Sequence, residues 1–284
     1  MHIPVLLKEI TEDIQPNENY VDCTMNGGGH TKEILKNNGP DGKVLGIEID
    51  KEIFDRVEKQ ERLIAVNDSY VNLKKIVEEN GLKDIKGVLF DIGMSSYHVD
   101  SSERGFSFQK DEPLVMSYSG GITAEEILNE WRENEIEKIL KEYGEERFAR
   151  KISKKIVEKR KGEKIKSTLQ LVQIIKEATP GFYHHDKTHF ATRTFQALRI
   201  AVNDELNNFK KALPQALEVL DKGGRLMSIS FHSLEDRIIK EFLKEKEKSG
   251  EVKIITSKPI VPGEEEIQSN PRSRSSKLRI GIKI

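Results

Sequence analysis

The chain has 284 residues, of which 36% are hydrophobic and 33% charged, and its formal net charge is −1. This length gives room for one large or two modest domains with ample core. No segment approaches the roughly 18 consecutive apolar residues of a membrane span, and the acidic N-terminal residues do not resemble a signal peptide. Cys23 is the single cysteine, so an intrachain disulfide is excluded. We therefore predict a soluble protein of the reducing cytoplasm, with no membrane partner.

Basic residues are unevenly distributed along the chain. Residues 141–166 carry eleven Lys or Arg against five acids, and residues 271–284 carry five Lys or Arg and no acid. Local basic patches on a nearly neutral protein are typical of phosphate-binding surfaces. A solvated helix face explains the charge of residues 141–166 equally well, but it explains the acid-free tail less well.

The first part of the chain alternates between extended and helical patterns. Short apolar strands that alternate with helices predict a parallel sheet whose ligand site lies at the carboxyl ends of the strands. Asp22, Glu48, Asp68 and Asp91 all fall at such ends. The expected strands are 19–23, 43–49, 63–67 and 86–91, and the expected helices are near 31–37, 51–59 and 71–80.

The regular pattern stops after Asp91. Residues 92–121 are rich in Gly and Ser without a sustained period, and so long an irregular connection is usually functional or disordered; its interleaved aromatic residues and arginine argue against disorder. The composition then becomes helical, with capping boxes at Thr123-x-x-Glu126 and Ser167-x-x-Gln170. No strand pattern returns before about residue 222. We therefore expect an all-helical insertion over residues 123–205.

The α/β pattern returns near the C-terminus. An amphipathic helix over 209–220 precedes a strand, R-L-M-S-I-S-F, and Ser233-x-x-Asp236 is expected to cap the helix that follows. Two extended runs, 252–256 and 277–284, predict a β-hairpin that closes the sheet. One α/β domain is thus expected from residues 1–122 and 206–284, interrupted by the helical domain 123–205.

The most informative stretch is Tyr20–His30, which runs from an extended segment through an acidic residue into a three-glycine turn that opens a helix. Glycine allows positive φ and close approach of a ligand, and the helix directs free N–H groups toward that ligand. Glu48 follows about twenty residues later, where a carboxylate reaches ribose hydroxyls in nucleotide-binding βαβ units. The pattern predicts an adenosine-containing cofactor but does not choose which one.

Asp91 is the main candidate for chemistry. At the end of the fourth strand, its carboxylate can hydrogen-bond an amine, accept a proton or hold a cofactor; the alternative role is to cap a turn. The seven histidines show no metal-site spacing with Cys or carboxylate partners, so no metal site is predicted. Cys23 lies inside the glycine turn, where it is not expected to act as a covalent nucleophile.

Residues 189–200 combine aromatic and basic side chains. His189, Arg193 and Gln196 lie on adjoining turns of a predicted helix, and Phe190 can serve its packed side. These are ingredients of single-stranded RNA recognition, through stacking and phosphate contact. An ordinary amphipathic helix is the equally good alternative.

Eight motifs stand out along the chain: HIPVLLKE (2–9), DCTMNGGGH (22–30), LFDIGMSS (89–96), ERGFSF (103–108), YGEERFA (143–149), ATRTFQALRI (191–200), SFHSLEDR (230–237) and NPRSRSSKLR (270–279). Together they resemble the ribosomal RNA small-subunit methyltransferase H family, also called MraW. The resemblance spans nearly the whole chain. It implies a bacterial enzyme that uses S-adenosylmethionine to methylate N4 of a decoding-centre cytidine in 16S ribosomal RNA. It also implies a class I methyltransferase fold, a Rossmann-like α/β sheet with an inserted helical domain.

The resemblance also implies roles for individual residues. The implied cofactor contacts are Gly28, Gly29, His30, Glu48, Tyr70, Asp91 and His98. Three departures from the family pattern stand out. Asn26 replaces the first glycine of the turn, which is tolerable because Asn also adopts left-handed conformations. Tyr97-His98 replaces Pro-Gln, and P-L-V-M-S-Y-S at 113–119 lacks two acids and an arginine of the family.

The resulting hypothesis is methyl transfer to a cytidine amine of ribosomal RNA in the small subunit, with Asp91 or nearby backbone carbonyls as the acceptor for an amine N–H. The target base would be flipped out and stacked on Phe106 or Phe108. The remaining expected RNA contacts are Arg104, Arg193, Arg272 and Arg274. Two alternatives stay open, a nicotinamide-dependent oxidoreductase and a non-catalytic RNA-binding or assembly protein. A homodimer is also left open.

Overall fold

A computed structural model describes residues 4–284, so His2 and Ile3 of the first family motif lie outside the described residues. The chain divides into two compact units. Unit 1 comprises the chain up to Ser95 together with Leu206–Ile284, and unit 2 comprises Ser96–Glu205. Unit 1 is therefore built from two separate stretches of sequence, with unit 2 inserted between them.

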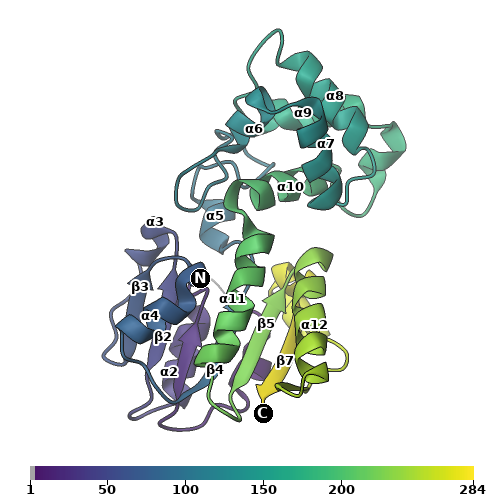
Figure 1. Ribbon diagram of the computed structural model, residues 1–284. Coiled ribbons are helices and arrows are strands. Elements are labelled where there is room, and N and C mark those ends of the chain that lie inside the picture. Colours follow the sequence, from purple (N-terminus) through teal and green to yellow (C-terminus); the bar gives the residue numbers. More distant parts are fainter. Residues whose placement is uncertain (1–3) are drawn as a thin grey trace. The chain divides into compact units, whose positions relative to one another are not determined.

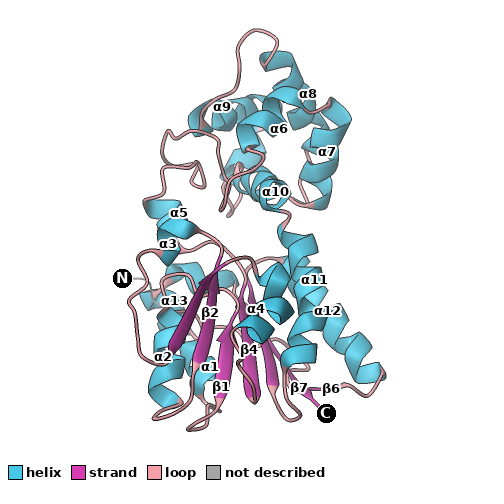
Figure 2. Cartoon of the chain, turned by 60° about the vertical axis from the view of Figure 1, so that its left-hand side comes forward, coloured by secondary structure: helices cyan, strands magenta, loops and turns pink. Residues whose placement is uncertain are grey.

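Unit 1 is organised around a seven-stranded sheet in the order β3-β2-β1-β4-β5-β7-β6 (Figures 1 and 2). Neighbouring strands pair in parallel except β7, which is antiparallel to both β5 and β6. This mostly parallel, Rossmann-like sheet confirms the predicted α/β fold class. The strands are β1 Asn19–Asp22, β2 Val44–Glu48, β3 Leu63–Asn67, β4 Ile85–Asp91, β5 Arg225–Ser230, β6 Val252–Ile254 and β7 Lys277–Lys283.

The strands follow the sequence prediction closely. The four early strands each lie within the predicted range or differ from it by one residue at an end. The last two strands pair antiparallel, as the predicted hairpin requires, although a helix and two irregular stretches separate them. The apolar runs were decisive here, because strands buried on both faces read as nearly continuous hydrophobic segments.

Helices cover both faces of the sheet (Figure 2). Successive residues of β4 illustrate the division, since Val88 and Phe90 join the core under α4, α11 and α12 while Leu89 joins the core under α1 and α2. Side chains of a strand alternate between the two faces of the sheet, so one strand contributes side chains to two cores. The helices of this unit are α1 Leu7–Thr11, α2 Gly29–Asn37, α3 Lys51–Phe54, α4 Leu73–Glu79, α11 Glu205–Val219, α12 Ser233–Lys248 and α13 Glu264–Ser269, with 3-10 turns at Tyr70–Asn72 and Pro271–Ser275.

Two local predictions in unit 1 are corrected. The helix expected over residues 51–59 ends at Phe54, because residues 55–59 contribute no buried side chain that would hold another turn. The cap of α12 lies one residue earlier than predicted. The N-cap is His232, whose ring accepts from the backbone N–H of Glu235, while the carboxylate of Glu235 accepts from the backbone N–H of His232.

Unit 2 contains helices and no strand among its residues 96–205. The predicted capping boxes at Thr123 and Ser167 are both present. Ile152 and Ile156 of α8 and Leu171 and Ile175 of α9 are buried, as the helical spacing predicted. The helices are α5 Ser96–Asp100, α6 Ala124–Glu130, α7 Glu133–Glu142, α8 Ala149–Lys159, α9 Thr168–Ala178 and α10 Thr192–Asn203, with a 3-10 turn at Gly181–His185.

The irregular segment 96–122 belongs to the helical unit. The backbone N–H of Leu114 donates to Lys166, and that of Thr168 donates to Glu112. Leu114 and Met116 are fully buried. The boundary between the units thus follows Ser95, earlier than the expected boundary at residue 122, because the segment packs with the helices of unit 2.

No helix within residues 4–284 has both the length and the apolar character needed to cross a membrane.

Candidate functional site

Three carboxylates lie at the carboxyl ends of adjacent parallel strands of unit 1. Asp22 ends β1, Glu48 ends β2 and Asp91 ends β4, and their exposed fractions are 1%, 5% and 7%. Burying a carboxylate is costly unless it is hydrogen-bonded or paired. Three such groups at one sheet edge therefore indicate a site, at the edge where ligands of open α/β sheets bind.

The glycine turn connects β1 to α2 beside these carboxylates. Asn26 and Gly28 take φ values of 48° and 78°, so the expected left-handed conformation of Asn26 is found. A Cβ added at Gly27 or Gly28 would meet no atom within 4 Å. The Oδ2 atom of Asp22 accepts from the hydroxyl of Thr31 at 2.7 Å, which joins the strand to the first turn of α2. The turn leaves open space for a ligand at its glycines.

Glu48 braces the turn from the neighbouring strand. Its Oε2 accepts from the backbone N–H of Asn26 at 2.8 Å, and its Oε1 accepts from the N–H of Asp50 at 2.7 Å. Each carboxylate oxygen has a second lone pair, so both can still accept from a hydroxyl. Burial raises the pKa of Glu48 to about 7, and the nearby Asp50 and Asp22 charges add to this.

His30 and Asp91 form the centre of the site. The Nδ1 atom of His30 lies 3.6 Å from Oδ2 of Asp91, and its Nε2 lies 2.9 Å from the carbonyl oxygen of Val5. Because a carbonyl only accepts, Nε2 carries the proton. The backbone N–H of Asp91 donates to Thr24 at 2.6 Å, which fixes the end of β4 against the turn. The second oxygen of Asp91, Oδ1, is buried and accepts no hydrogen bond from residues 4–284.

Opposing effects set the pKa of Asp91. Burial raises it to about 6, His30 lowers it, and the charges of Asp22 and Glu235 raise it. Burial also raises the pKa of Asp22, while His30 and Thr31 lower it. A carboxylate with a pKa near 6 is ionised at neutral pH and still has appreciable proton affinity, which suits a general base.

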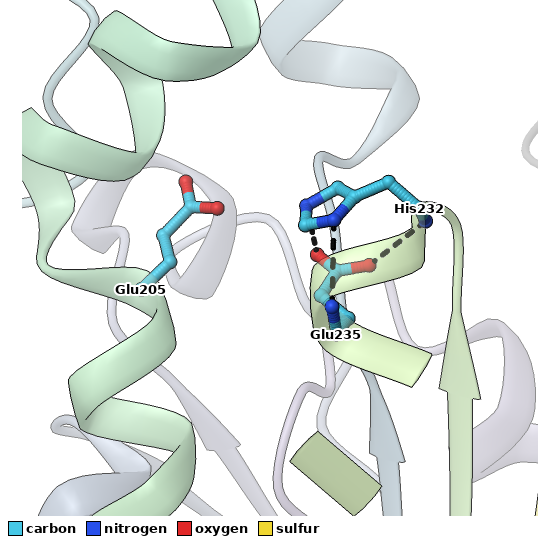
Figure 3. Close-up of side chains that lie close together, drawn as sticks. All are labelled: Glu205, His232 and Glu235. Atoms are coloured by element: carbon cyan, nitrogen blue, oxygen red, sulfur yellow. Dashed lines mark hydrogen bonds and ion pairs between the residues drawn. The ribbon is translucent and has the colours of Figure 1, made fainter. Parts of the chain in front are cut away.

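His232 and Glu235 were not predicted as site residues, although their motif was noted. Figure 3 shows the ring of His232 over the carboxylate of Glu235 at the start of α12. The Nε2 atom of His232 lies 2.9 Å from Oε1 of Glu235, and Oε2 accepts from the N–H of Phe231 at 2.8 Å. Glu235 is fully buried. The negative charge of Glu235 raises the pKa of Asp91, so the two carboxylates interact electrostatically. No local sequence pattern shows this relationship.

The remaining predicted cofactor contacts have distinct surroundings. Gly29 begins α2, and a Cβ there would come within 2.7 Å of Pro4, so this glycine is also required by packing. Tyr70 is half-buried in a 3-10 turn, and its ring meets Phe90 edge-on at 5.7 Å. His98 belongs to unit 2, where its buried ring lies 4.7 Å from Tyr118 and 4.9 Å from Phe106.

The predicted RNA contacts divide into buried and exposed side chains. Phe106 is 6% exposed and stacks on Tyr118 at 5.3 Å, and the half-buried Arg104 donates to the backbone carbonyl of Ser117. Phe108 is half-buried and stacks on His189 at 4.6 Å. The exposed members are Arg193, Arg272 and Arg274.

The whole chain, residues 1–284, matches the family described as the MraW methylase family. Relatives described as "Ribosomal RNA small subunit methyltransferase H" align along nearly their full length. One from Clostridium botulinum is 44% identical and covers 100% of this chain and 99% of the relative. One from Halothermothrix orenii is 43% identical, covering 100% and 98%, and one from Heliobacterium mobile is 44% identical, covering 100% and 99%.

Proposed function

The chain belongs to the MraW methylase family, and we propose that it uses S-adenosylmethionine to methylate N4 of a cytidine in the decoding centre of 16S ribosomal RNA. Its substrate is the small ribosomal subunit in the cytoplasm. The observation that carries the proposal is the buried Asp91 carboxylate, whose Oδ1 accepts no hydrogen bond from residues 4–284. Membership in a family of methylases decides against the nicotinamide-dependent alternative.

The residues at the sheet edge fit the cofactor. A ligand with two adjacent hydroxyls, such as a ribose, can donate to Glu48, whose oxygens each retain an acceptor site. The open space at Gly27 and Gly28 admits close approach to the backbone. Tyr70 offers an aromatic ring at the end of β3 for the adenine, and the buried carboxylates Asp22 and Asp91 offset positive charge on a bound ligand. Gly29 and His30 complete the expected cofactor contacts, with His98 expected from unit 2.

When bound, S-adenosylmethionine supplies an activated methyl group on a positively charged sulfur. The protein's own task is then to align the acceptor amine and to improve it as a nucleophile. A cytidine N4 amine is a poor nucleophile because its lone pair is delocalised into the ring. Asp91 accepts a hydrogen bond from an N–H of this amine, which localises the lone pair on nitrogen, and then takes up the proton that the methylated amine releases.

His30 supports Asp91 in this role. With Nε2 committed to the carbonyl of Val5, Nδ1 faces Oδ2 of Asp91 at 3.6 Å, and a ring that carries both protons can orient the carboxylate by electrostatic attraction. A carboxylate held in one orientation needs less reorganisation when the amine arrives. The role of His30 is therefore to position Asp91.

Unit 2 and the C-terminal tail bind the RNA around the target base. We assign this role to the helical insertion, expected at residues 123–205, together with the segment that precedes it. Arg193, Arg272 and Arg274 are exposed, and the half-buried Arg104 and Phe108 lie in the preceding segment, whereas Phe106 is buried against Tyr118. Phosphate contacts make this binding weaken with salt.

The experiment is methyl transfer from labelled S-adenosylmethionine to small ribosomal subunits that lack the modification, followed by nucleoside analysis. We expect label in N4-methylcytidine, and a decrease in kcat of about 10²- to 10⁴-fold in Asp91→Asn. Calorimetric titration of the cofactor into the same variant controls for folding and binding. Label in a different nucleoside, or an unchanged rate in Asp91→Asn, contradicts the proposal. Cofactor binding without any label favours the non-catalytic assembly role.

The altered segment 113–119 does not by itself favour that second role. Leu114, Met116 and Ser117 are buried, and the hydroxyl of Tyr118 donates to Glu205 at 3.1 Å. Among the residues that depart from the family pattern, Ser117 is buried, Val115 and Tyr118 are half-buried, and Ser119 is exposed. The segment belongs to unit 2, whereas Asp22, Glu48 and Asp91 belong to unit 1, so these departures leave the carboxylates of the sheet edge unchanged.

A further inference from the structure

Phe182 is the most exposed large hydrophobic side chain among residues 4–284, with 65% of its surface accessible. It lies in the 3-10 turn that follows α9 in unit 2. A single exposed apolar residue is ordinary on a protein surface. The surroundings of Phe182 are not ordinary, because a set of aromatic and cationic side chains is arranged around it.

Arg147 is held among three aromatic rings. Its guanidinium carbon lies 4.5 Å from the ring centre of Tyr183, 5.3 Å from that of Phe148 and 5.8 Å from that of Phe182. Asp186 pairs with the guanidinium at 2.6 Å and fixes it further. Phe148 and Phe182 meet edge-on at 6.3 Å. The exposed ring of Phe182 is thus supported from one side, which lowers the entropy cost of stacking something on its free side.

The neighbouring face of α8 carries unneutralised positive charge. Arg150, Lys151 and Lys154 are exposed, and none of them forms an ion pair with an acid in the part of the chain that the structure describes. Lys151 extends toward the same cluster, with its Nζ 5.8 Å from the ring of Phe148. Lys155 and Lys159, farther along α8, are instead paired with Glu177. The open charge is therefore concentrated at the end of α8 nearest Phe182.

We propose that Phe182, Arg147, Lys151 and Lys154, hereafter the Phe182 platform, bind single-stranded RNA, with an unpaired base stacked on Phe182 and the flanking phosphates on the two lysines. Charge complementarity selects the occupant. A polyanion with flat, polarisable groups matches a supported aromatic ring bordered by cations. Any base has a π-face, so this interaction adds affinity without reading sequence. The platform rests on the proposed function only in naming ribosomal RNA as the natural strand.

The first test measures binding of a fluorescein-labelled single-stranded RNA of about 12 nucleotides by anisotropy. Phe182→Ala is expected to weaken binding about 5- to 100-fold, and Phe182→Trp to retain it. In Lys151→Gln/Lys154→Gln, the slope of log K against log salt is expected to become shallower by about 0.7 for each lysine–phosphate interaction that is removed. An acidic peptide of similar length serves as the competing occupant.

Matched controls come from residues outside the platform. Leu169→Ala removes another exposed apolar side chain, at the opposite end of α9, and Lys83→Gln removes an exposed cation before β4. Neither is expected to change RNA binding. Because Phe182 is exposed, thermal unfolding of Phe182→Ala should match that of the unmodified chain. Unchanged RNA binding in Phe182→Ala, or tighter binding of the acidic peptide than of RNA, overturns the platform.

Kinetics on small ribosomal subunits separate this inference from the proposed function. Phe182→Ala is expected to raise KM for subunits about 5- to 100-fold with kcat unchanged, because the ring acts only in binding. Methylation with an unaltered KM in Phe182→Ala overturns the platform and leaves the proposed function standing. RNA binding that depends on Phe182, without any methylation, supports the platform and contradicts the proposed function.

Discussion

The Nδ1 edge of His30 faces Oδ2 of Asp91 at 3.6 Å, while the opposite nitrogen of the same ring is held by the backbone of Val5. The pair connects the first turn of α2 to the end of β4, across the glycine turn. His30 lowers the pKa of Asp91, whereas the negative charges of Asp22 and Glu235 raise it. Substitutions at His30 and Glu235 should therefore shift the pKa of Asp91 in opposite directions.

His30→Gln removes the group that lowers the pKa of Asp91, while its amide can still donate to Val5. The pKa of Asp91 should then rise above about 6, so the acidic limb of the pH profile of kcat/KM should move to higher pH. Activity at about pH 6.5 should fall more than activity at about pH 8.5. Methyl transfer measured from about pH 5 to 9 checks this. An equal loss at every pH would show that His30 does not act through the charge of Asp91.

Glu235→Gln should shift the same limb in the opposite direction. Removing this negative charge lowers the pKa of Asp91, so the acidic limb should move to lower pH. Gln can serve the capping box as Glu does, so α12 should keep its N-terminus. The measurement is the same pH profile, with circular dichroism to check helicity. A shift toward higher pH would contradict the electrostatic assignment.

Glu48 should make the stability of the protein depend on pH. Its folded pKa of about 7 exceeds its ordinary value of 4.5, so the folded state favours the protonated carboxyl. This contribution is fully present below pH 4.5 and is lost as the pH rises through 7. Relative to Glu48→Gln, the free energy of unfolding of the unmodified chain should fall by about 3 kcal/mol across that window. Urea titrations at several pH values measure it, and a rise or a flat difference would contradict the prediction.

The two glycines of the turn provide a matched pair. Gly28→Ala should lower the free energy of unfolding by about 1–2 kcal/mol, because φ is 78° there and a Cβ is strained in the left-handed region. Gly27→Ala, without positive φ and with equally open space, should cost less. Both methyl groups would project into space proposed for the cofactor, so both should weaken its binding in calorimetry. Equal stability losses would refute the backbone explanation.

The sequence predicted the parts of the site that local patterns encode. Glu48 and Asp91 end apolar strands, and the positions of parallel strand ends follow from the alternation of elements. Residues 92–122, by contrast, have no period, so nothing local shows that Leu114 and Met116 pack with the helices. The cap at His232 was missed because Ser233 is the more usual capping residue, and the proximity of Glu235 to Asp91 depends on tertiary structure alone.

The two-segment construction of unit 1 has a consequence for synthesis. Strand β4 lies in the middle of the sheet, yet its partner β5 follows it only after all of unit 2. At roughly 5–20 residues per second, one edge of β4 stays unpaired for several seconds while the insertion leaves the ribosome. Unpaired edges invite association with other chains. Unit 2 can bury its own core during this interval, so the nascent chain then consists of a folded unit 2 and a unit 1 whose sheet is still incomplete.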